Sequence, residues 1–262
     1  MKKFLRLLAM ASILCVASTA RATPSTTVWA PSTAAFQGYL VPHLTYDTYF
    51  SKGAGKIAPV DTGVTMGVLP FEKINAEAGF DLLLPGNDPL LLHGKIGTPE
   101  GALFDGAPGL ALGIFGVGTT DATSYDMLYA QVGKTIPRIG GYVSVGGYYA
   151  VGKEALFRSS TGETNKAGFI GGITAPDLNV NLSWLKKIVL AGDVQTGRNV
   201  FGAGGLAVSF YFTDAIAVLT GPIFFIDSAL QPGGSNFMWT VQLDVDLPLI
   251  SAPAPVPAAP KI

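Results

Sequence analysis

The side chains that could do acid–base or ion-binding chemistry gather in four segments of an otherwise apolar chain. Glu77 and Asp81 belong to the first segment, and His93 and Lys95 to the second. The remaining candidates are Lys187, Asp193 and Gln195 in the third segment and Thr240, Gln242, Asp244 and Asp246 in the fourth. Within each segment the spacing is even, so an extended strand would carry them on one face. Such faces predict either a structural ion-pair network that fills an enclosed space or a polar constriction that selects solutes.

Catalysis would need groups that these segments do not obviously supply. The chain has two histidines, His43 and His93, and neither lies beside a G-x-S-x-G nucleophile motif. We therefore predict no enzymatic activity and no catalytic residues, although a triad can be assembled from residues distant in sequence. The only cysteine, Cys15, leaves no cysteine cluster for zinc, and we predict neither a metal nor a cofactor.

Strand pairing would bring the charged candidates together. A three-residue hairpin loop at Gly86–Asp88 would place Asp81 opposite His93 and Gly79 opposite Lys95. Lys95 would then lie diagonal to Glu77 and Asp81. If the last strand closes on the first, Asp244 and Asp246 should approach Tyr46, Asp47 and Thr48. The acidic excess predicts a preference for cations in any pore that these residues line.

The elements that must position these residues are strands. Between Phe237 and Leu247 the odd positions are apolar, and the even positions from Thr240 onward are polar or acidic. A period of two with such different faces is typical of a strand between lipid or core and a polar interior. Twelve candidate strands cover residues 35–50, 60–69, 74–84, 89–97, 109–117, 125–134, 140–151, 167–174, 187–195, 202–212, 215–226 and 237–247. Glycine pairs such as Gly171-Gly172 and Gly204-Gly205 indicate close strand packing or barrel curvature.

The beginning of the chain indicates export. A positive start, an apolar run over residues 7–16 and Ala20-Arg21-Ala22 form a secretory leader that would be cleaved after Ala22. Of the 17 basic residues four lie in this leader and none of the 18 acidic ones does, so the mature chain carries a net charge of −5. This balance excludes typical nucleic-acid binding. The expected organisation is a leader over residues 1–22, a barrel over residues 23–250 and a tail rich in Pro and Ala over residues 251–262.

Composition separates a membrane barrel from a soluble β-sandwich. Charged residues make up 13% of the chain, about half the usual share for soluble proteins, while apolar residues reach 48%. No apolar run after the leader is long enough for a helical span. We therefore predict an all-β fold, a single antiparallel transmembrane β-barrel of about twelve strands, with a soluble sandwich as the alternative. With both termini in the periplasm, the connections over residues 98–108 and 175–186 would be unusually long inward turns.

With its leader, its repeated alternation and the last strand Trp239-Thr240-Val241-Gln242-Leu243-Asp244-Val245-Asp246-Leu247, the chain resembles bacterial outer-membrane β-barrel proteins. The resemblance covers nearly all of the mature chain. It implies an outer-membrane location, contact with outer-membrane lipids and recognition of the last strand by the barrel-assembly machinery. Members of this class commonly end on an aromatic residue, whereas this chain continues to Ile262, so its closing strand is internal.

Two functions follow from such a barrel. The first is a small porin-like channel for small polar or cationic solutes, whose lumen receives the charged candidates named above. The second is a non-conducting barrel that anchors or scaffolds an envelope assembly. Twelve strands give an interior between a filled eight-strand barrel and an open porin, so the contents of the interior decide between the two functions.

Overall fold

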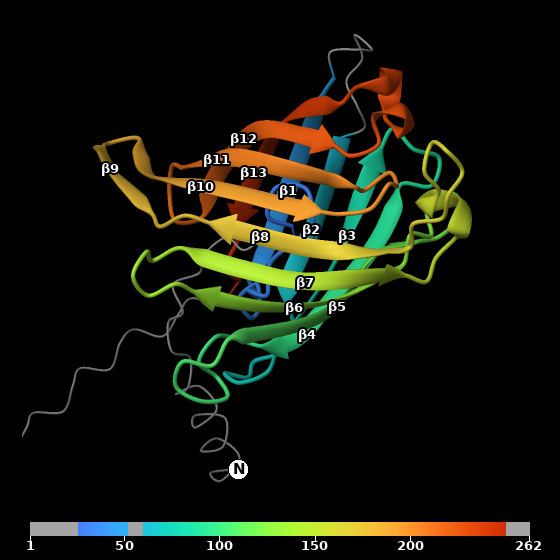
Figure 1. Cartoon of the computed structure of the whole chain (residues 1–262). Coiled ribbons are helices and arrows are strands. Elements are labelled where there is room, and N and C mark those ends of the chain that lie inside the picture. The colour runs from blue at the N-terminus through green and yellow to red at the C-terminus, as the bar shows by residue number, and fades with distance from the viewer. Residues whose placement is uncertain (1–25, 52–59, 250–262) are drawn as a thin grey trace, which may run out of the picture.

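Twelve antiparallel strands close into a barrel in the computed structural model, which describes residues 26–51 and 60–249 (Figure 1). Each barrel strand pairs with the next along the chain, apart from one short strand that lies outside the ring, and the first strand pairs with the last to close it. The strands are β1 (Pro42–Phe50), β2 (Val60–Gly67), β3 (Asn75–Leu84), β4 (Leu90–Thr98), β5 (Gly109–Gly118), β6 (Met127–Thr135), β7 (Tyr142–Ala150), β8 (Ala167–Thr174), β9 (Leu178–Leu182), β10 (Leu185–Gln195), β11 (Ala203–Tyr211), β12 (Ile216–Phe225) and β13 (Phe237–Asp246). Short 3-10 turns η1 (Glu154–Phe157), η2 (Ser228–Leu230) and η3 (Pro232–Gly234) occupy two of the connections. The predicted all-β barrel is confirmed.

The alternation of side chains explains the closed shape. In β13 the side chains of Trp239, Val241 and Leu243 are 37–45% exposed, whereas Thr240 and Gln242 are buried. The same division recurs around the ring, with Leu112, Leu128, Val145, Ile173, Leu190, Leu206 and Phe224 among the exposed apolar side chains. Closure leaves no unpaired sheet edge in the ring, as hydrocarbon surroundings require. The barrel therefore has an apolar outer surface and a polar inner one.

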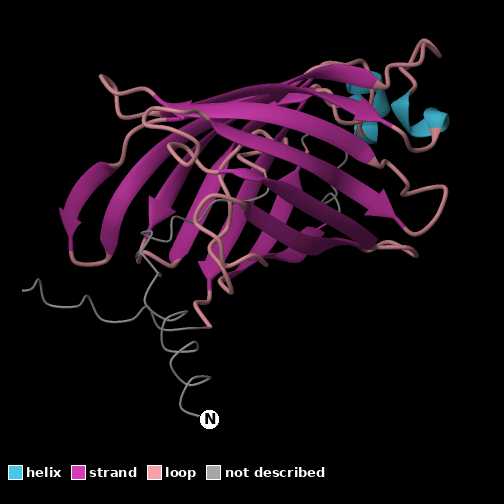
Figure 2. Cartoon of the chain, turned by 90° about the horizontal axis from the view of Figure 1, so that it is seen from below, coloured by secondary structure: helices cyan, strands magenta, loops and turns pink. Residues whose placement is uncertain are grey.

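The two ends of the barrel differ. We call the end where the chain enters β1 and leaves β13 the terminal end, and the opposite end the loop end. The loop end carries the connections over residues 85–89, 119–126, 151–166, 196–202 and 226–236, including η1, η2 and η3 (Figure 2). The connection between β8 and β10 lies at the terminal end and contains β9, which pairs with β10 as a hairpin that projects beyond the barrel (Figure 1).

The first predicted strand is wrong in its N-terminal half. It was expected over residues 35–50, but β1 begins at Pro42. Leu40 has a positive φ of 54°, which breaks the extended backbone, and the chain before it leads into the barrel, where Ala34 and Gln37 are buried. The prediction of a long turn over residues 175–186 is also incomplete, because this connection contains the strand β9. Every other predicted strand begins and ends within two residues of an observed one.

Two predicted registers are corrected as well. In the β3–β4 hairpin Glu77 lies opposite Lys95 and Gly79 opposite His93, a shift of two residues. The chain reverses around Gly86, and the amide of Leu83 donates to the carbonyl of Pro89, so the loop is wider than three residues. At the seam, Asp246 lies opposite His43 and Asp244 opposite Thr45, nearer the terminal end than Asp47.

No helix among residues 26–51 and 60–249 is long and apolar enough to cross a membrane.

The barrel interior as the candidate functional site

An N-terminal stretch of the chain lies inside the barrel (Figures 1 and 2). We call residues 26–41 the inner segment. The amide of Thr27 donates to the carbonyl of Ala30 at 3.1 Å, and the Ser32 hydroxyl donates to the Thr27 hydroxyl at 2.8 Å, so the chain turns back on itself. The tip of this turn points toward the loop end, where the Trp29 indole donates to the carbonyl of Phe201 at 2.8 Å. The inner segment contains no charged residue.

Asp193 on β10 holds the tip of the inner segment. Its Oδ2 accepts the amides of Val28, Trp29 and Ala30 at 2.8, 2.9 and 2.9 Å. The Ser32 hydroxyl lies 3.3 Å from the same oxygen. Asp193 is 7% exposed, so one buried carboxylate oxygen satisfies three successive amides that a turn leaves without partners.

Side chains from other strands satisfy the carbonyls of the inner segment. Gln131 and Ser144 donate to the carbonyls of Pro31 and Ser32, and Gln242 donates to the carbonyl of Val28 at 2.8 Å. Lys95 lies 2.6 Å from the carbonyl oxygen of Ala35 and 3.4 Å from that of Thr33. The wall thus binds the backbone of the segment from at least five strands.

An ion pair and an acidic residue hold the foot of the inner segment. The Lys95 ammonium lies 3.0 Å from Glu77 Oε1, and both side chains are about 1% exposed. Glu77 Oε2 accepts the amide of Gln37 at 2.8 Å, and the Gln37 side chain donates to Asp246 at 2.8 Å. The charged side chains that were predicted on one face of β3 and β4 therefore bind the backbone of residues 33–37.

Glycines on the inner wall make room for this backbone. A Cβ added at Gly205 would lie 2.9 Å from Val28 Cβ, and one at Gly172 would lie 2.7 Å from the carbonyl oxygen of Ser32. At Gly67 the added carbon would lie 2.4 Å from the carbonyl oxygen of Gln37, whereas at Gly133 it would meet the Tyr142 hydroxyl before the Cβ of Ala34. One member of each of the pairs Gly171-Gly172 and Gly204-Gly205 thus serves the inner segment, a role that strand packing alone does not describe.

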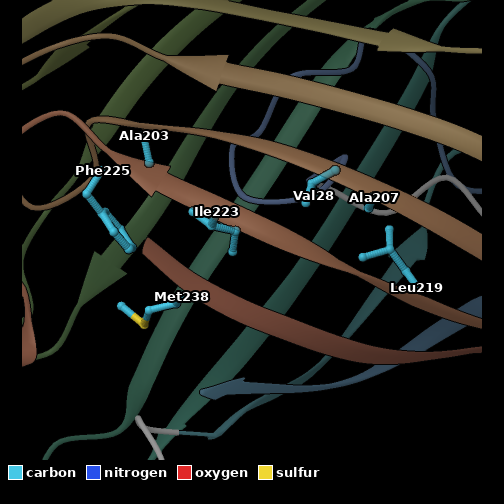
Figure 3. Close-up of a cluster of buried hydrophobic side chains, with 7 residues drawn as sticks. All are labelled: Val28, Ala203, Ala207, Leu219, Ile223, Phe225 and Met238. Atoms are coloured by element: carbon cyan, nitrogen blue, oxygen red, sulfur yellow. The ribbon is translucent and has the colours of Figure 1, made fainter. Parts of the chain in front are cut away.

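The Val28 side chain fills an apolar part of the interior (Figure 3). It belongs to one buried apolar cluster with residues of β11, β12 and β13, namely Ala203, Ala207, Leu219, Ile223, Phe225 and Met238. The Trp29 ring meets the edges of Tyr49 and Phe225 at centroid distances of 5.9 and 5.3 Å. The tip is therefore bound by shape as well as by hydrogen bonds.

His43 occupies the seam between the first and last strands. Its Nδ1 lies 2.9 Å from Asp246 Oδ1 and its Nε2 lies 3.3 Å from Asp244 Oδ1. The side chain is buried, at 2% exposure, on the inner face of the barrel. Two carboxylates beside the two ring nitrogens favour the charged imidazolium form, whose Nδ1 donates to Asp246.

The second histidine, His93, lies between a hydroxyl group and a carboxylate. His93 Nε2 lies 2.7 Å from Thr65 Oγ1, and His93 Nδ1 lies 3.4 Å from Asp81 Oδ2. This order of groups is that of a nucleophile, a base and an acid. All three residues are buried, and the Phe115 ring stacks on His93 at 6.0 Å. His93 Nδ1 makes no hydrogen bond to Asp81, so the order of three groups is incomplete and the arrangement gives Thr65 a structural partner.

The other predicted residues lie apart from these contacts. Gln195 is buried near the loop end, where its amide nitrogen lies 3.4 Å from the sulfur of Met127. Lys187 is nearer the terminal end, pairs with Asp177 at 2.9 Å and lies 4.4 Å from the Tyr211 ring centroid. Among the described residues no group of three or more His, Cys, Asp or Glu side chains has an arrangement suited to a metal ion.

Connections fold over the loop end. Phe157 of η1 is fully buried and packs on Phe201, and the Tyr125 ring meets Phe201 edge-on at 4.5 Å. Asp227 Oδ2 accepts the amide and the hydroxyl of Ser160 at 3.0 Å each, with the Arg198 guanidinium 3.7 Å away. These contacts tie four connections together above the tip of the inner segment.

Acid should loosen this cover. The backbone amide of Ser160, followed by its hydroxyl, lowers the pKa of Asp227 below its usual value. A carboxyl with a lowered pKa stabilises the folded form above its unfolded pKa of about 3.9, and the stabilisation is lost as the pH falls through the folded value. We expect the hydrogen-exchange protection of the Ser160 amide to fall below pH 4, and Asp227→Asn to show low protection at pH 7 already. Unchanged protection between pH 6 and pH 3 would contradict this account.

The sequence patterns did not predict four features of this site: the inner segment, Gln131, Ser144 and the glycines of the inner wall. The segment has no alternation and no charge, so its residues carried no signal of a site. The inner position of Gln131 follows from the alternation of β6, with Met127 and Tyr129 buried and Leu128 exposed. That alternation could have identified Gln131 before the structure.

A closed antiparallel barrel with an apolar outer face and a buried polar inner face is a transmembrane β-barrel of the bacterial outer-membrane class. No family model matches the sequence, and no curated protein matches it. Among solved structures, the NanC porin superposes with a TM-score of 0.48 at 8% identity, over 78% of this chain and 100% of that chain. An outer-membrane channel from Pseudomonas putida F1 gives 0.44 at 9% identity, over 87% and 100%.

The outer-membrane phospholipase A from Escherichia coli gives a TM-score of 0.45 at 13% identity, over 82% of this chain and 94% of that chain. Scores and identities this low establish no relationship to any one of these proteins. The class of the chain therefore rests on its own architecture.

Proposed function

We propose that this barrel is a small porin-like channel for small polar or cationic solutes, and that its permeation path is the barrel interior. The observation that carries this proposal is the charged inner wall. A buried ion pair such as Glu77–Lys95 is often no more stable than well-packed apolar side chains of the same volume. A barrel that only had to be filled would be as stable with an apolar interior, so charged groups inside indicate contact with water or solutes in another state.

The charge on the inner wall favours cations. The buried acidic groups are Asp47, Glu77, Asp81, Asp193, Asp244 and Asp246, and the buried basic groups are Lys95, His43 and His93. Rings of carboxylates attract cations and repel anions. The path proposed for solutes runs along Glu77, Asp81, His93, Lys95, Asp193, Gln195, Gln242, Asp244 and Asp246, with Lys187 near one mouth.

We expect the purified protein to give infrequent, cation-selective conductance steps in a planar bilayer. In a salt gradient, Asp244→Asn together with Asp246→Asn should move the reversal potential toward zero, because the wall loses two negative charges. Asp121→Asn removes an exposed carboxylate that pairs with Lys153 on a connection, and it should leave the reversal potential unchanged. Anion selectivity, or no steps at any voltage from either the full chain or a variant without residues 26–37, would refute the channel.

The second candidate is a non-conducting barrel that anchors an envelope assembly. The observation in its favour is the inner segment, which occupies the interior beneath the cover formed by the connections. The same bilayer experiment separates the two candidates, since an anchor gives no steps in any variant. Recognition of β13 by the barrel-assembly machinery stays a prediction.

A further inference from the structure

We propose that residues 26–41 are a removable plug, an intrachain peptide ligand that closes the channel and that a separate peptide can replace. This inference rests on the proposed channel function and adds its regulation. It starts from a contrast within the interior: the wall carries the charges, and the segment that occupies it carries none. The wall therefore binds the segment in the way that a receptor binds a separate peptide.

The contacts are mostly to the peptide backbone. Asp193 and Glu77 accept backbone amides, while Lys95, Gln131, Ser144 and Gln242 donate to backbone carbonyls. Each of these wall groups can be satisfied by water or ions when the segment leaves, because each is an ordinary polar side chain. Release of the plug therefore leaves a hydrated, charged path, which an apolar wall could not provide.

The seat for the plug is built into the wall. Gly172 and Gly205 face inward from β8 and β11, and a side chain at either position would overlap Ser32 or Val28. The Val28 side chain is 1% exposed and belongs to an apolar cluster with residues of β11, β12 and β13 (Figure 3). Glycines where the peptide passes and an apolar cluster that receives one side chain are the features of a specific binding site.

The attachment of the segment allows it to move as a unit. Residues 38–41 stay bound to the wall, since the Leu40 amide donates to the Gly67 carbonyl at 2.9 Å and Tyr39 forms a bridge with Gly67. Residues 26–37 are connected to the barrel wall through this one end within the described residues. The tip can therefore withdraw toward the terminal end without breaking any strand pairing.

The first test deletes residues 26–37 and keeps the bound residues 38–41. We expect at least a tenfold increase in the open probability of the channel in planar bilayers. A synthetic peptide of residues 26–37, added to both chambers, should close the deleted channel again. The matched control peptide carries Val28→Lys, which would bury a charge in the apolar cluster, and it should not close the channel. Heat-modifiable migration on gels verifies that the deleted barrel is folded.

A second variant keeps the whole chain. A Cβ at Gly172 would lie 3.1 Å from Ser32 Cβ, closer than the ~3.5–4.5 Å of a disulfide, so the bond forms once the segment shifts slightly away from β8. Cys15 is the only native cysteine, so the double variant Ser32→Cys with Gly172→Cys has no other partner outside the predicted leader. We expect this oxidised variant to stay closed and to regain openings on reduction, whereas Ser32→Cys alone should not respond to reduction.

The outcomes separate the two proposals. Equal open probability with and without residues 26–37, together with no effect of the disulfide, overturns the plug and leaves the channel standing. No conductance from any of these proteins overturns the channel and with it the plug. If the control peptide closes the channel as strongly as the native peptide, the proposed specific binding of the Val28 side chain is also overturned.

Discussion

Replacing Asp193 with Ala should destabilise the folded barrel by about 3 kcal/mol or more. The substitution leaves the amides of Val28, Trp29 and Ala30 without their acceptor, and each buried donor without a partner costs about 1–3 kcal/mol. The loss stays below the full sum where water enters the space left by the carboxylate. Asp193→Asn should be intermediate, because its oxygen can still accept amides without the negative charge.

Urea unfolding in detergent micelles, followed by tryptophan fluorescence, measures this effect. The matched control is Asp214→Asn, which removes an exposed carboxylate paired with Lys186 at the terminal end. Exposed pairs contribute about 0–1 kcal/mol, so the control should unfold close to the unmodified chain. An Asp193→Ala variant that is no less stable than the control would show that the tip of the inner segment is not anchored as described.

Replacing Lys95 with Met should have a comparable effect for a different reason. Glu77 would remain buried with its charge and without the ammonium group 3.0 Å away. Breaking a buried ion pair by removing one partner costs about 3–5 kcal/mol. The carbonyls of Thr33 and Ala35 would also lose a donor, which adds to the loss.

A double variant distinguishes two effects of losing Lys95: the unpaired charge left on Glu77 and the loss of packing. We expect Glu77→Gln with Lys95→Met to be more stable than Lys95→Met alone, because the glutamine is neutral and no charge remains without a counter-ion. Measuring the free energy of unfolding for the two single variants, the double variant and the unmodified chain completes a double-mutant cycle. Strictly additive losses would mean that Glu77 and Lys95 do not depend on each other.

The strands were predictable because the alternation depends on local sequence alone. Each strand separates a lipid-facing row from an inward row, so the period of two is visible in β3, β6 and β13 without any knowledge of partners. The inner segment was not predictable in this way. Its conformation is fixed by side chains that lie at least 40 positions further along the chain, such as Glu77 and Asp193.

Residue type and spacing identified the candidate residues, but they did not identify the groups that these residues bind. Even spacing placed Glu77, Lys95 and Asp246 on common faces, and each is buried on the inner wall. Their hydrogen bonds run to Gln37 and Ala35, which no strand pattern relates to them. The hairpin register was off by two residues because loop width depends on local turn geometry, which the dipeptide signals around Gly86 do not determine.

The position of the inner segment also constrains the order of assembly. It immediately precedes β1, and β1 gains its second neighbour only when β13, the last of the described strands, is in place. The segment must therefore enter before the seam between β1 and β13 shuts, or follow later through an open mouth. In the first case the strands assemble around the inner segment. Folding kinetics of the chain without residues 26–37 would then report on biogenesis as well as on permeation.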